Sequence, residues 1–218
     1  MRITKLKVKG ILFDLDGTLV DSKQAYIEAA RTTFQALGQE PPTIGSALQI
    51  PKRLEQNQPL EDLIGNSKAQ FLDIYLKTFY DITETKTEPM PNINKTLETL
   101  QNRAKLALIT MRNVPSTAIT KELENFGLAR YFVYIVTARD THKPKPSPEA
   151  LVRTLKAMNV QVCECLIVGD SPSDIRAGKA GGAKTVAVTS GLYTKEELAN
   201  LNPDLILKDA NQLPNYIE

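Results

Sequence analysis

Four aspartates in this 218-residue chain are the side chains best suited to chemistry, because each pair follows a short apolar run. Asp14 and Asp16 come directly after the first run and lie two residues apart, so they project to the same side of an extended chain. Asp170 and Asp174 follow another run. Carboxylates held close together raise one another's pKa unless a cation neutralises them. An all-oxygen ligand set of this kind suits Mg²⁺, which keeps several waters and binds phosphate oxygens.

Groups that could bind a phosphoryl group follow two further apolar runs. Thr110 ends one of them, and Lys143 and Lys145 lie in a proline-rich segment after the other. Hydroxyl, ammonium and backbone amide groups can hold a phosphoryl group, whose transition state spreads negative charge over its oxygens. One aspartate can then attack phosphorus while its neighbour handles the proton of the leaving group. The residues therefore indicate Mg²⁺-assisted phosphoryl transfer.

Composition excludes several other kinds of site. One histidine, His142, and two cysteines, Cys163 and Cys165, are too few for a zinc site of four His or Cys side chains. The net charge is +2, from 27 basic and 25 acidic residues, so no strong field attracts nucleic acid or an anionic membrane. The two cysteines are a poor disulfide pair on a strand, and no segment is apolar enough for a signal peptide or a membrane span. We expect a cytoplasmic protein that binds neither nucleic acid nor membranes.

The elements that must position these residues form an α/β pattern, in which short apolar runs alternate with amphipathic segments. The predicted strands are 6–13, 106–110, 131–136, 165–168, 185–188 and 205–207. They are rich in Val, Ile and Leu, which is typical of strands covered on both faces. The pattern predicts a doubly wound, Rossmann-like parallel sheet. Ligands bind beyond the carboxyl ends of such strands, so the residues described above are expected to converge on one rim.

Residues 20–90 interrupt this alternation. Segments 24–37 and 61–80 are predicted to be helices, separated by a loop that contains Pro41, Pro42, Gly45 and Pro51. We expect a core domain of residues 1–19 and 91–218, with a mobile helical cap domain, 20–90, inserted after the first strand. Five aromatic residues at helical spacings are expected to form the core of this insertion: Tyr26, Phe34, Phe71, Tyr75 and Phe79.

The motifs resemble those of the haloacid dehalogenase superfamily of phosphatases, over residues 6–188. The resemblance rests on four segments in order: Asp14-Leu15-Asp16-Gly17-Thr18, Thr110, the segment Lys143-Pro144-Lys145-Pro146, and Gly169-Asp170 with Asp174. The inserted helical segment is similar to the C1-type cap of the group that includes phosphoglycolate phosphatase and β-phosphoglucomutase. Family dehalogenases lack the second aspartate of the first motif, so Asp16 implies phosphate substrates.

The resemblance implies a role for each of these residues. Asp14 is the implied nucleophile that forms an aspartyl-phosphate, and Asp16 the implied general acid and base. Thr110 and Lys145 are the implied phosphate-binding residues, because Lys145 matches the family spacing to the following helix better than Lys143 does. The implied Mg²⁺ ligands are Asp14, the backbone carbonyl of Asp16 and Asp170, with Asp174 in support.

Three functions from different classes remain open from the sequence. The first is a Mg²⁺-dependent phosphatase of a small phosphorylated metabolite, which acts through an aspartyl-phosphate. The second is a phosphosugar mutase of the β-phosphoglucomutase type, which shares the core motifs. The third is a non-hydrolytic phosphoacceptor module, which needs neither the helical cap nor Asp16.

Several residue roles also stay open. Arg112 either contacts substrate or is a solvated surface charge, and Lys52 and Arg53 either reach the substrate cleft or are solvated. Asp174 either supports the metal or mainly holds the lysine. The physiological substrate is undetermined, and the oligomeric state is expected to be a monomer or a homodimer.

Overall fold

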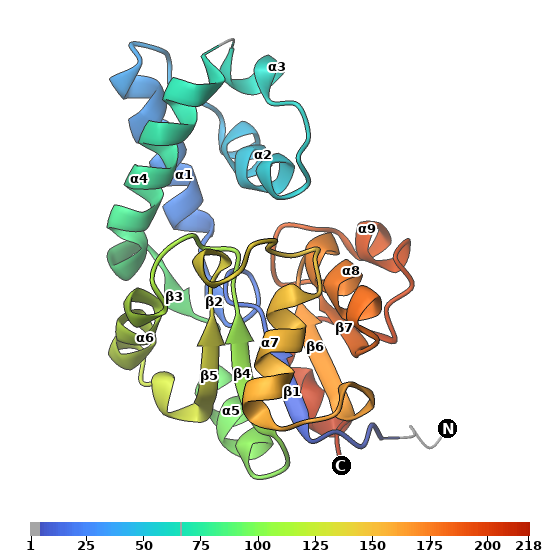
Figure 1. Ribbon diagram of the computed structural model, residues 1–218. Helices are drawn as coiled ribbons and strands as arrows, with labels where there is room; N and C mark the ends of the chain where they lie inside the picture. The colour runs from blue at the N-terminus through green and yellow to red at the C-terminus, as the bar shows by residue number, and fades with distance from the viewer. Residues whose placement is uncertain (1–4, 66) are drawn as a thin grey trace. The chain divides into compact units, whose positions relative to one another are not determined.

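The computed structural model describes residues 5–65 and 67–218 (Figure 1). The chain divides into two compact units, Met1–Val20 with Pro89–Glu218, and Asp21–Glu88. The chain passes between them at β2 (Val20–Asp21) and β3 (Glu88–Pro89), which pair as a two-stranded sheet. No helix of the described residues is long and apolar enough to cross a membrane.

The larger unit is built on a six-stranded sheet whose neighbouring strands are all parallel. In spatial order the strands are β5 (Phe132–Val136), β4 (Lys105–Ile109), β1 (Gly10–Phe13), β6 (Cys165–Gly169), β7 (Lys184–Val188) and β8 (Leu205–Leu207). Strands β1 and β6 are buried along their whole length, as expected for central strands covered on both faces. The predicted doubly wound parallel sheet is confirmed.

Helices cover the two faces of the sheet because successive side chains of each strand point to opposite sides. Ile11 and Phe13 of β1 belong to a core shared with α5 (Ile93–Gln101) and α6 (Ser116–Asn125). Leu12 belongs to a second core, shared with α7 (Glu149–Met158). The same core includes Ile167 of β6, against which α8 (Pro172–Gly181) packs closely at Gly178. The remaining short helices are η1 (Ala129–Tyr131), η2 (Ala138–Asp140), η3 (Val162–Glu164), α9 (Lys195–Ala199) and η4 (Ala210–Asn215).

The described residues of the smaller unit form four helices: α1 (Lys23–Ala36), α2 (Ile44–Glu55), α3 (Glu61–Ile64) and α4 (Lys68–Lys86). Its core combines aliphatic side chains with the aromatic residues that the helical spacing predicted. Phe34, Phe71, Tyr75 and Phe79 are buried in one cluster, and Tyr26 stacks on Phe79 with 4.8 Å between ring centroids. These aromatic side chains therefore stabilise the unit by apolar burial.

Two expectations for this unit were wrong. The predicted loop with its prolines contains α2, which begins at the N-cap Thr43 and continues through Pro51. An internal proline costs roughly 3 kcal/mol in a helix, but burial of Ala47 and Ile50 on one face favours the helix here. The predicted single helix 61–80 is two helices, because Gly65 with φ +70° ends α3 and α4 runs on to Lys86.

Candidate active site

Three adjacent strands of the larger unit, β4, β1 and β6 (Figure 1), are followed at their carboxyl ends by all the predicted site residues except Lys145, which comes after β5. Asp14 follows β1, and its N–H donates to the Val168 carbonyl oxygen of β6 at 2.9 Å. Thr110 follows β4, and its N–H donates to the carbonyl oxygen of Val136 at 2.9 Å. Asp170 follows β6. All three side chains are buried, so the strand register fixes them at the rim of the sheet.

Lys145 is the lysine that the structure places beside Asp14. Its Nζ donates to Asp14 Oδ1 at 2.6 Å, to Asp174 Oδ1 at 2.5 Å and to the carbonyl oxygen of Ile109 at 3.1 Å. These bonds use all three ammonium donors, and the residue is only 4% exposed. Lys143 is exposed. The bond to Ile109 also places the ammonium next to Thr110, the following residue in the chain.

The loop that carries Lys145 is anchored to the start of α7. The Glu149 carboxylate accepts hydrogen bonds from the N–H of His142 at 2.8 Å and of Lys143 at 2.9 Å. These bonds, led by that from His142, lower the pKa of Glu149. Arg153 Nη1 donates to the carbonyl oxygen of Asp140 at 2.5 Å, at the other end of the loop. A helix terminus therefore positions the loop from which Lys145 reaches the rim.

Asp174 has both carboxylate oxygens engaged. Oδ1 accepts from Lys145, and Oδ2 accepts from Ser171 Oγ at 2.7 Å and from the Ser171 N–H at 3.2 Å. Ser171 is the N-cap of α8, and Asp174 completes its capping box. The start of α8 thus fixes Asp174 as a support for the lysine.

Asp170 lies against two glycines that have no room for a side chain. A Cβ on Gly191 would lie 1.7 Å from Asp170 Oδ2, and a Cβ on Gly17 would lie 2.6 Å from the same atom. Gly17 also has φ +81°, which favours glycine. Thr18 Oγ1 donates to Asp170 Oδ1 at 3.4 Å. Gly17 lies within a recognised motif, whereas no sequence signal pointed to Gly191.

The rim has an excess of buried negative charge. Ligand oxygens of Asp14, Asp170 and Asp174 all lie within 4.8 Å of one another. With one ammonium beside them, the group carries a net charge of −2 when all are ionised (−3 + 1). Burial raises the pKa of Asp14, and Lys145 offsets part of that rise. Burial lowers the pKa of Lys145, but Asp14 and Asp174 outweigh it, so the net shift is upward and the ammonium stays charged. Buried carboxylate oxygens with uncompensated charge fit a hard divalent cation such as Mg²⁺.

Asp16 points to Arg112 and not into this carboxylate group. Arg112 Nη2 donates to Asp16 Oδ1 at 2.7 Å, and Arg112 Nε donates to Asp16 Oδ2 at 2.9 Å. Nη1 of the same guanidinium donates to Glu122 of α6. Arg112 is 4% exposed, so the interpretation of Arg112 as a solvated surface charge is wrong. Its partner Glu122 was missed, because a contact ten residues away across a loop leaves no periodic signal.

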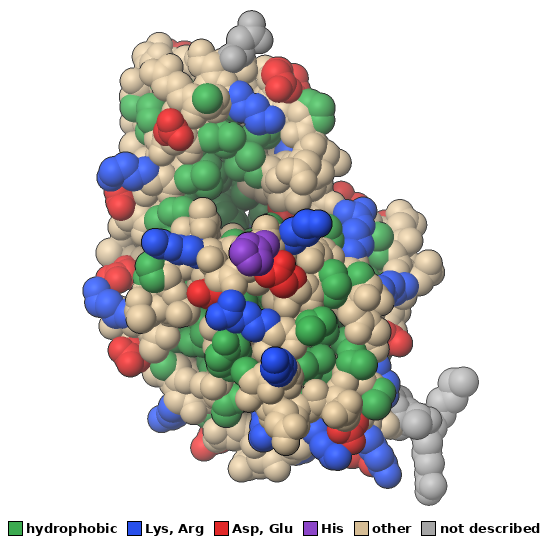
Figure 2. All heavy atoms as spheres, in the orientation of Figure 1, with side chains coloured by type: hydrophobic (Ala, Val, Ile, Leu, Met, Phe, Trp, Pro, Cys, Tyr) green, Lys and Arg blue, Asp and Glu red, His purple; other side chains and the backbone are tan. Residues whose placement is uncertain are grey.

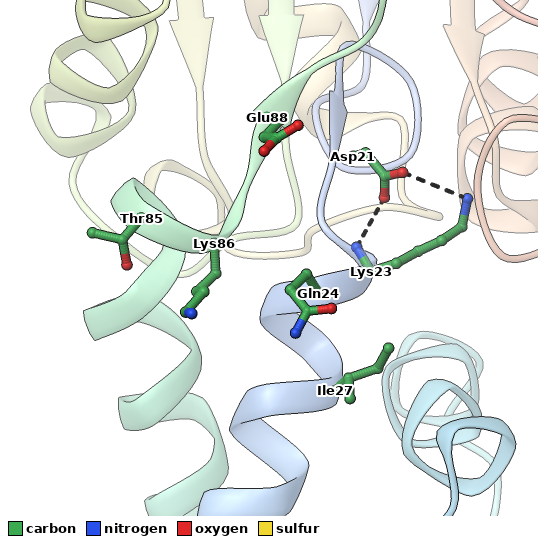
Figure 3. A pocket seen from close by; sticks show the side chains of 7 residues that line it. All are labelled: Asp21, Lys23, Gln24, Ile27, Thr85, Lys86 and Glu88. Atoms are coloured by element: carbon green, nitrogen blue, oxygen red, sulfur yellow. Dashed lines mark hydrogen bonds and ion pairs between the residues drawn. The ribbon is translucent and has the colours of Figure 1, made fainter.

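Charged residues elsewhere are more evenly distributed. Lys and Arg side chains are interspersed with Asp and Glu on the face in Figure 2. In the smaller unit, Arg53 pairs with Asp62 at 2.6 Å. The same unit has a pocket of about 520 Å³ at the ends of α1 and α4 (Figure 3), where Lys23 and Lys86 lie with two carboxylates. The residues that line it are Asp21, Lys23, Gln24, Ile27, Thr85, Lys86 and Glu88, none of them a predicted site residue.

Known proteins are similar to this chain in sequence along nearly its whole length. A phosphoglycolate phosphatase of Vibrio parahaemolyticus is 30% identical, over 97% of this chain and 96% of the relative. A phosphoglycolate phosphatase of Pseudomonas syringae pv. tomato is 31% identical, over 94% of this chain and 78% of the relative. A protein of Caldanaerobacter subterraneus, which is provisionally named a pyrophosphatase, is 30% identical, over 98% of this chain and 96% of the relative.

Solved structures share the fold. A haloacid dehalogenase-like family hydrolase from Streptococcus pneumoniae has a TM-score of 0.81 at 24% identity, over 96% of this chain and 98% of that one. The family model described as haloacid dehalogenase-like hydrolase matches residues 11–188. The prediction of a hydrolase of the phosphatase type is confirmed. With its strand-end aspartates and these similarities along its length, the chain belongs to the haloacid dehalogenase-like hydrolase family.

Proposed function

We propose that this phosphatase hydrolyses a small phosphate monoester through a phosphorylated Asp14, with Mg²⁺ as cofactor. The observation that carries the proposal is the position of Asp14, which is buried at the end of a central strand with Oδ1 held by Lys145 at 2.6 Å. A carboxylate fixed in this way is oriented to attack an incoming phosphorus atom with little rearrangement. The phosphatase activity then follows from two proton transfers around this nucleophile.

In the first step, an Asp14 carboxylate oxygen forms a bond to phosphorus while the bond from phosphorus to the alcohol oxygen breaks. Asp16, in its protonated form, gives its proton to the departing alcohol oxygen. In the second step, Asp16 removes a proton from water, and the water oxygen attacks the phosphorus on Asp14. Inorganic phosphate leaves, Asp14 is restored as a carboxylate, and Asp16 again carries a proton.

Binding of the phosphoryl group is assigned to Thr110 and Lys145. The Thr110 hydroxyl is a donor suited to the transferring oxygens, whose charge grows toward the transition state. The Lys145 ammonium supplies positive charge beside them, and it donates to the phosphoryl group by giving up one of its three present hydrogen bonds. Mg²⁺ supplies further positive charge to these oxygens when bound. Its proposed ligands are Asp14, the backbone carbonyl of Asp16 and Asp170, with Asp174 in support. The bonds from Asp174 to Lys145 and Ser171 favour a supporting role for that residue.

Phosphoglycolate is the first substrate to test, because several relatives are named phosphoglycolate phosphatase. We assign substrate selection to the helical unit Asp21–Glu88 acting as a cap. We also propose a cytoplasmic location, in which reducing conditions keep the free thiols of Cys163 and Cys165 intact.

The experiment is a panel of phosphate esters and pyrophosphate with Mg²⁺, with Asp14→Asn as the matched inactive variant. Release of phosphate from at least one ester, lost in the variant and after chelation of Mg²⁺, is the expected result. An Asp14→Asn protein as active as the wild type contradicts the proposal. A mutase would instead convert a sugar phosphate into its isomer without net release of phosphate.

A further inference from the structure

A buried ion-pair chain holds the side chain of Asp16. Arg112 follows β4 and binds both oxygens of Asp16, at 2.7 and 2.9 Å, while α6 supplies Glu122 on the far side of the guanidinium. The side chains of Arg112 and Glu122 are 3% and 4% exposed, whereas that of Asp16 is 15% exposed. Of the three side chains in this ion-pair series, that of Asp16 is therefore the one that a substrate can reach.

The charges exclude Arg112 as a receptor for an anionic substrate group. One guanidinium is shared between two carboxylates, so the three side chains carry a net charge of −1 when ionised (+1 − 2). An anion that bound Arg112 would have to displace the Asp16 carboxylate from the guanidinium. It would also have to lose its own hydration next to the Glu122 carboxylate. Such a replacement is unfavourable, because breaking a buried ion pair leaves an uncompensated charge.

The same geometry fixes the plane of the Asp16 carboxylate. Each of its two oxygens accepts a hydrogen bond from the same guanidinium, Oδ1 from Nη2 and Oδ2 from Nε. A bidentate fork constrains orientation more strongly than a single ammonium does.

We propose that Arg112, itself fixed by Glu122, is a positioning residue that orients the Asp16 carboxylate for proton transfer to the leaving group. This inference rests on the proposed role of Asp16 as general acid and base. Arg112 acts through Asp16 and does not touch substrate.

The test compares kcat/KM for an alkyl phosphate with kcat/KM for p-nitrophenyl phosphate, whose leaving group departs without a proton. For each ester, kcat/KM reports only the steps up to phosphorylation of Asp14. Slow dephosphorylation therefore does not mask the effect. Arg112→Met is expected to lower kcat/KM for the alkyl ester by about 10²-fold, the lower range for loss of general acid catalysis. The p-nitrophenyl ester is expected to lose far less of its kcat/KM.

Further variants separate positioning from folding. Arg112→Lys keeps the charge without the fork and is expected to restore part of the alkyl activity. Glu122→Gln is also expected to lower kcat/KM more for the alkyl ester than for the p-nitrophenyl ester, but by a smaller factor than Arg112→Met. The double variant Arg112→Met/Glu122→Gln is expected to lose no more activity than Arg112→Met alone, because Glu122 acts through Arg112. Glu124→Gln, on the exposed face of the same helix, is the control and is expected to match the wild type. Glu122→Gln and Arg112→Lys retain the test if Arg112→Met does not fold.

Equal losses of kcat/KM for both esters would overturn the proposal. A crystal structure of Arg112→Lys or Glu122→Gln gives a readout that is independent of turnover. A rotated or disordered Asp16 carboxylate is expected, and an unchanged one overturns the proposal. The proposed function fails separately, if the wild type hydrolyses no ester or Asp14→Asn remains active.

Discussion

Replacement of Gly191 by alanine is the substitution whose effect can be worked out most directly from the geometry. The new Cβ would lie 1.7 Å from Asp170 Oδ2, whereas ordinary contacts begin at 3.4 Å. The carboxylate must therefore move by about 1.7 Å, the difference between these two distances. The carboxylate cannot move freely, because Gly17 packs closely against the same oxygen, and a Cβ there would lie 2.6 Å away.

The expected loss is large in activity and moderate in stability. Misplacement of a reacting group by about 1 Å can cost roughly 10²-fold in rate, so we expect kcat/KM to fall by about that factor. The Mg²⁺ concentration for half-maximal activity should rise by about 10-fold or more, because Asp170 is a proposed ligand. Overpacking costs about 1–3 kcal/mol in the free energy of unfolding. That corresponds to a fall in Tm of about 2–12 °C in a chain of this size.

The assay is phosphate release titrated with Mg²⁺, with Tm measured in parallel on the metal-free protein. Gly45→Ala is the matched control, because a Cβ there has nothing nearer than 3.9 Å and the residue lies in α2. This control should keep full activity and gain a little stability. Wild-type kcat/KM and Mg²⁺ dependence in Gly191→Ala would refute the steric reasoning.

Two further predictions concern a lysine and a thiol. Lys145→Met should lower kcat/KM by at least about 10²-fold, because it removes a donor buried among carboxylates, whereas Lys143→Met should keep wild-type kinetics because Lys143 is exposed. Steady-state kinetics decide between them, and a larger loss in Lys143→Met contradicts the assignment. Cys165 should resist thiol reagents at pH 8, because burial raises its pKa to about 12 and leaves a thiolate fraction of about 10⁻⁴. The exposed Cys163 should react, so a colorimetric titration should find one fast thiol per chain, absent in Cys163→Ser, and two fast thiols contradict the burial of Cys165.

Much of the sheet was predictable because buried parallel strands are short, continuous apolar runs. The last strand, Leu205–Leu207, has the predicted bounds, and the four strands before it differ from their predicted bounds by one residue at one or both ends. The first strand is shorter than predicted and starts at Gly10. Leu6 pairs instead with Ile217 near the other end of the chain. Such a pairing depends on tertiary structure, and local periodicity does not report it.

The helical unit was harder to predict because packing there overrides local preference. A proline normally ends a helix, yet α2 continues through Pro51 since Ala47 and Ile50 face an apolar core. The segment after it has a helical pattern on both sides of Gly65. The positive φ of that residue divides the pattern into two helices.

The candidate site was predictable where one rule of topology applied. Residues that follow parallel strands meet at one rim, and the rule brought together Asp14, Lys145 and the acids after β6. Glu122 and Gly191 lie outside its reach, because one approaches Arg112 from a helix and the other is defined by the space it leaves for Asp170. Their contribution is visible only once the chain is folded.

The central claim is that Asp14 carries the phosphoryl group during turnover. Acid quenching of the wild-type enzyme with Mg²⁺ and an active ester, followed by peptide mass spectrometry, tests it most directly. We expect one phosphoryl group on the peptide that contains Asp14, at the first aspartate of the Asp14–Asp16 pair, and none in Asp14→Asn. Turnover without a phosphorylated enzyme, or a phosphoryl group on another residue, would contradict it.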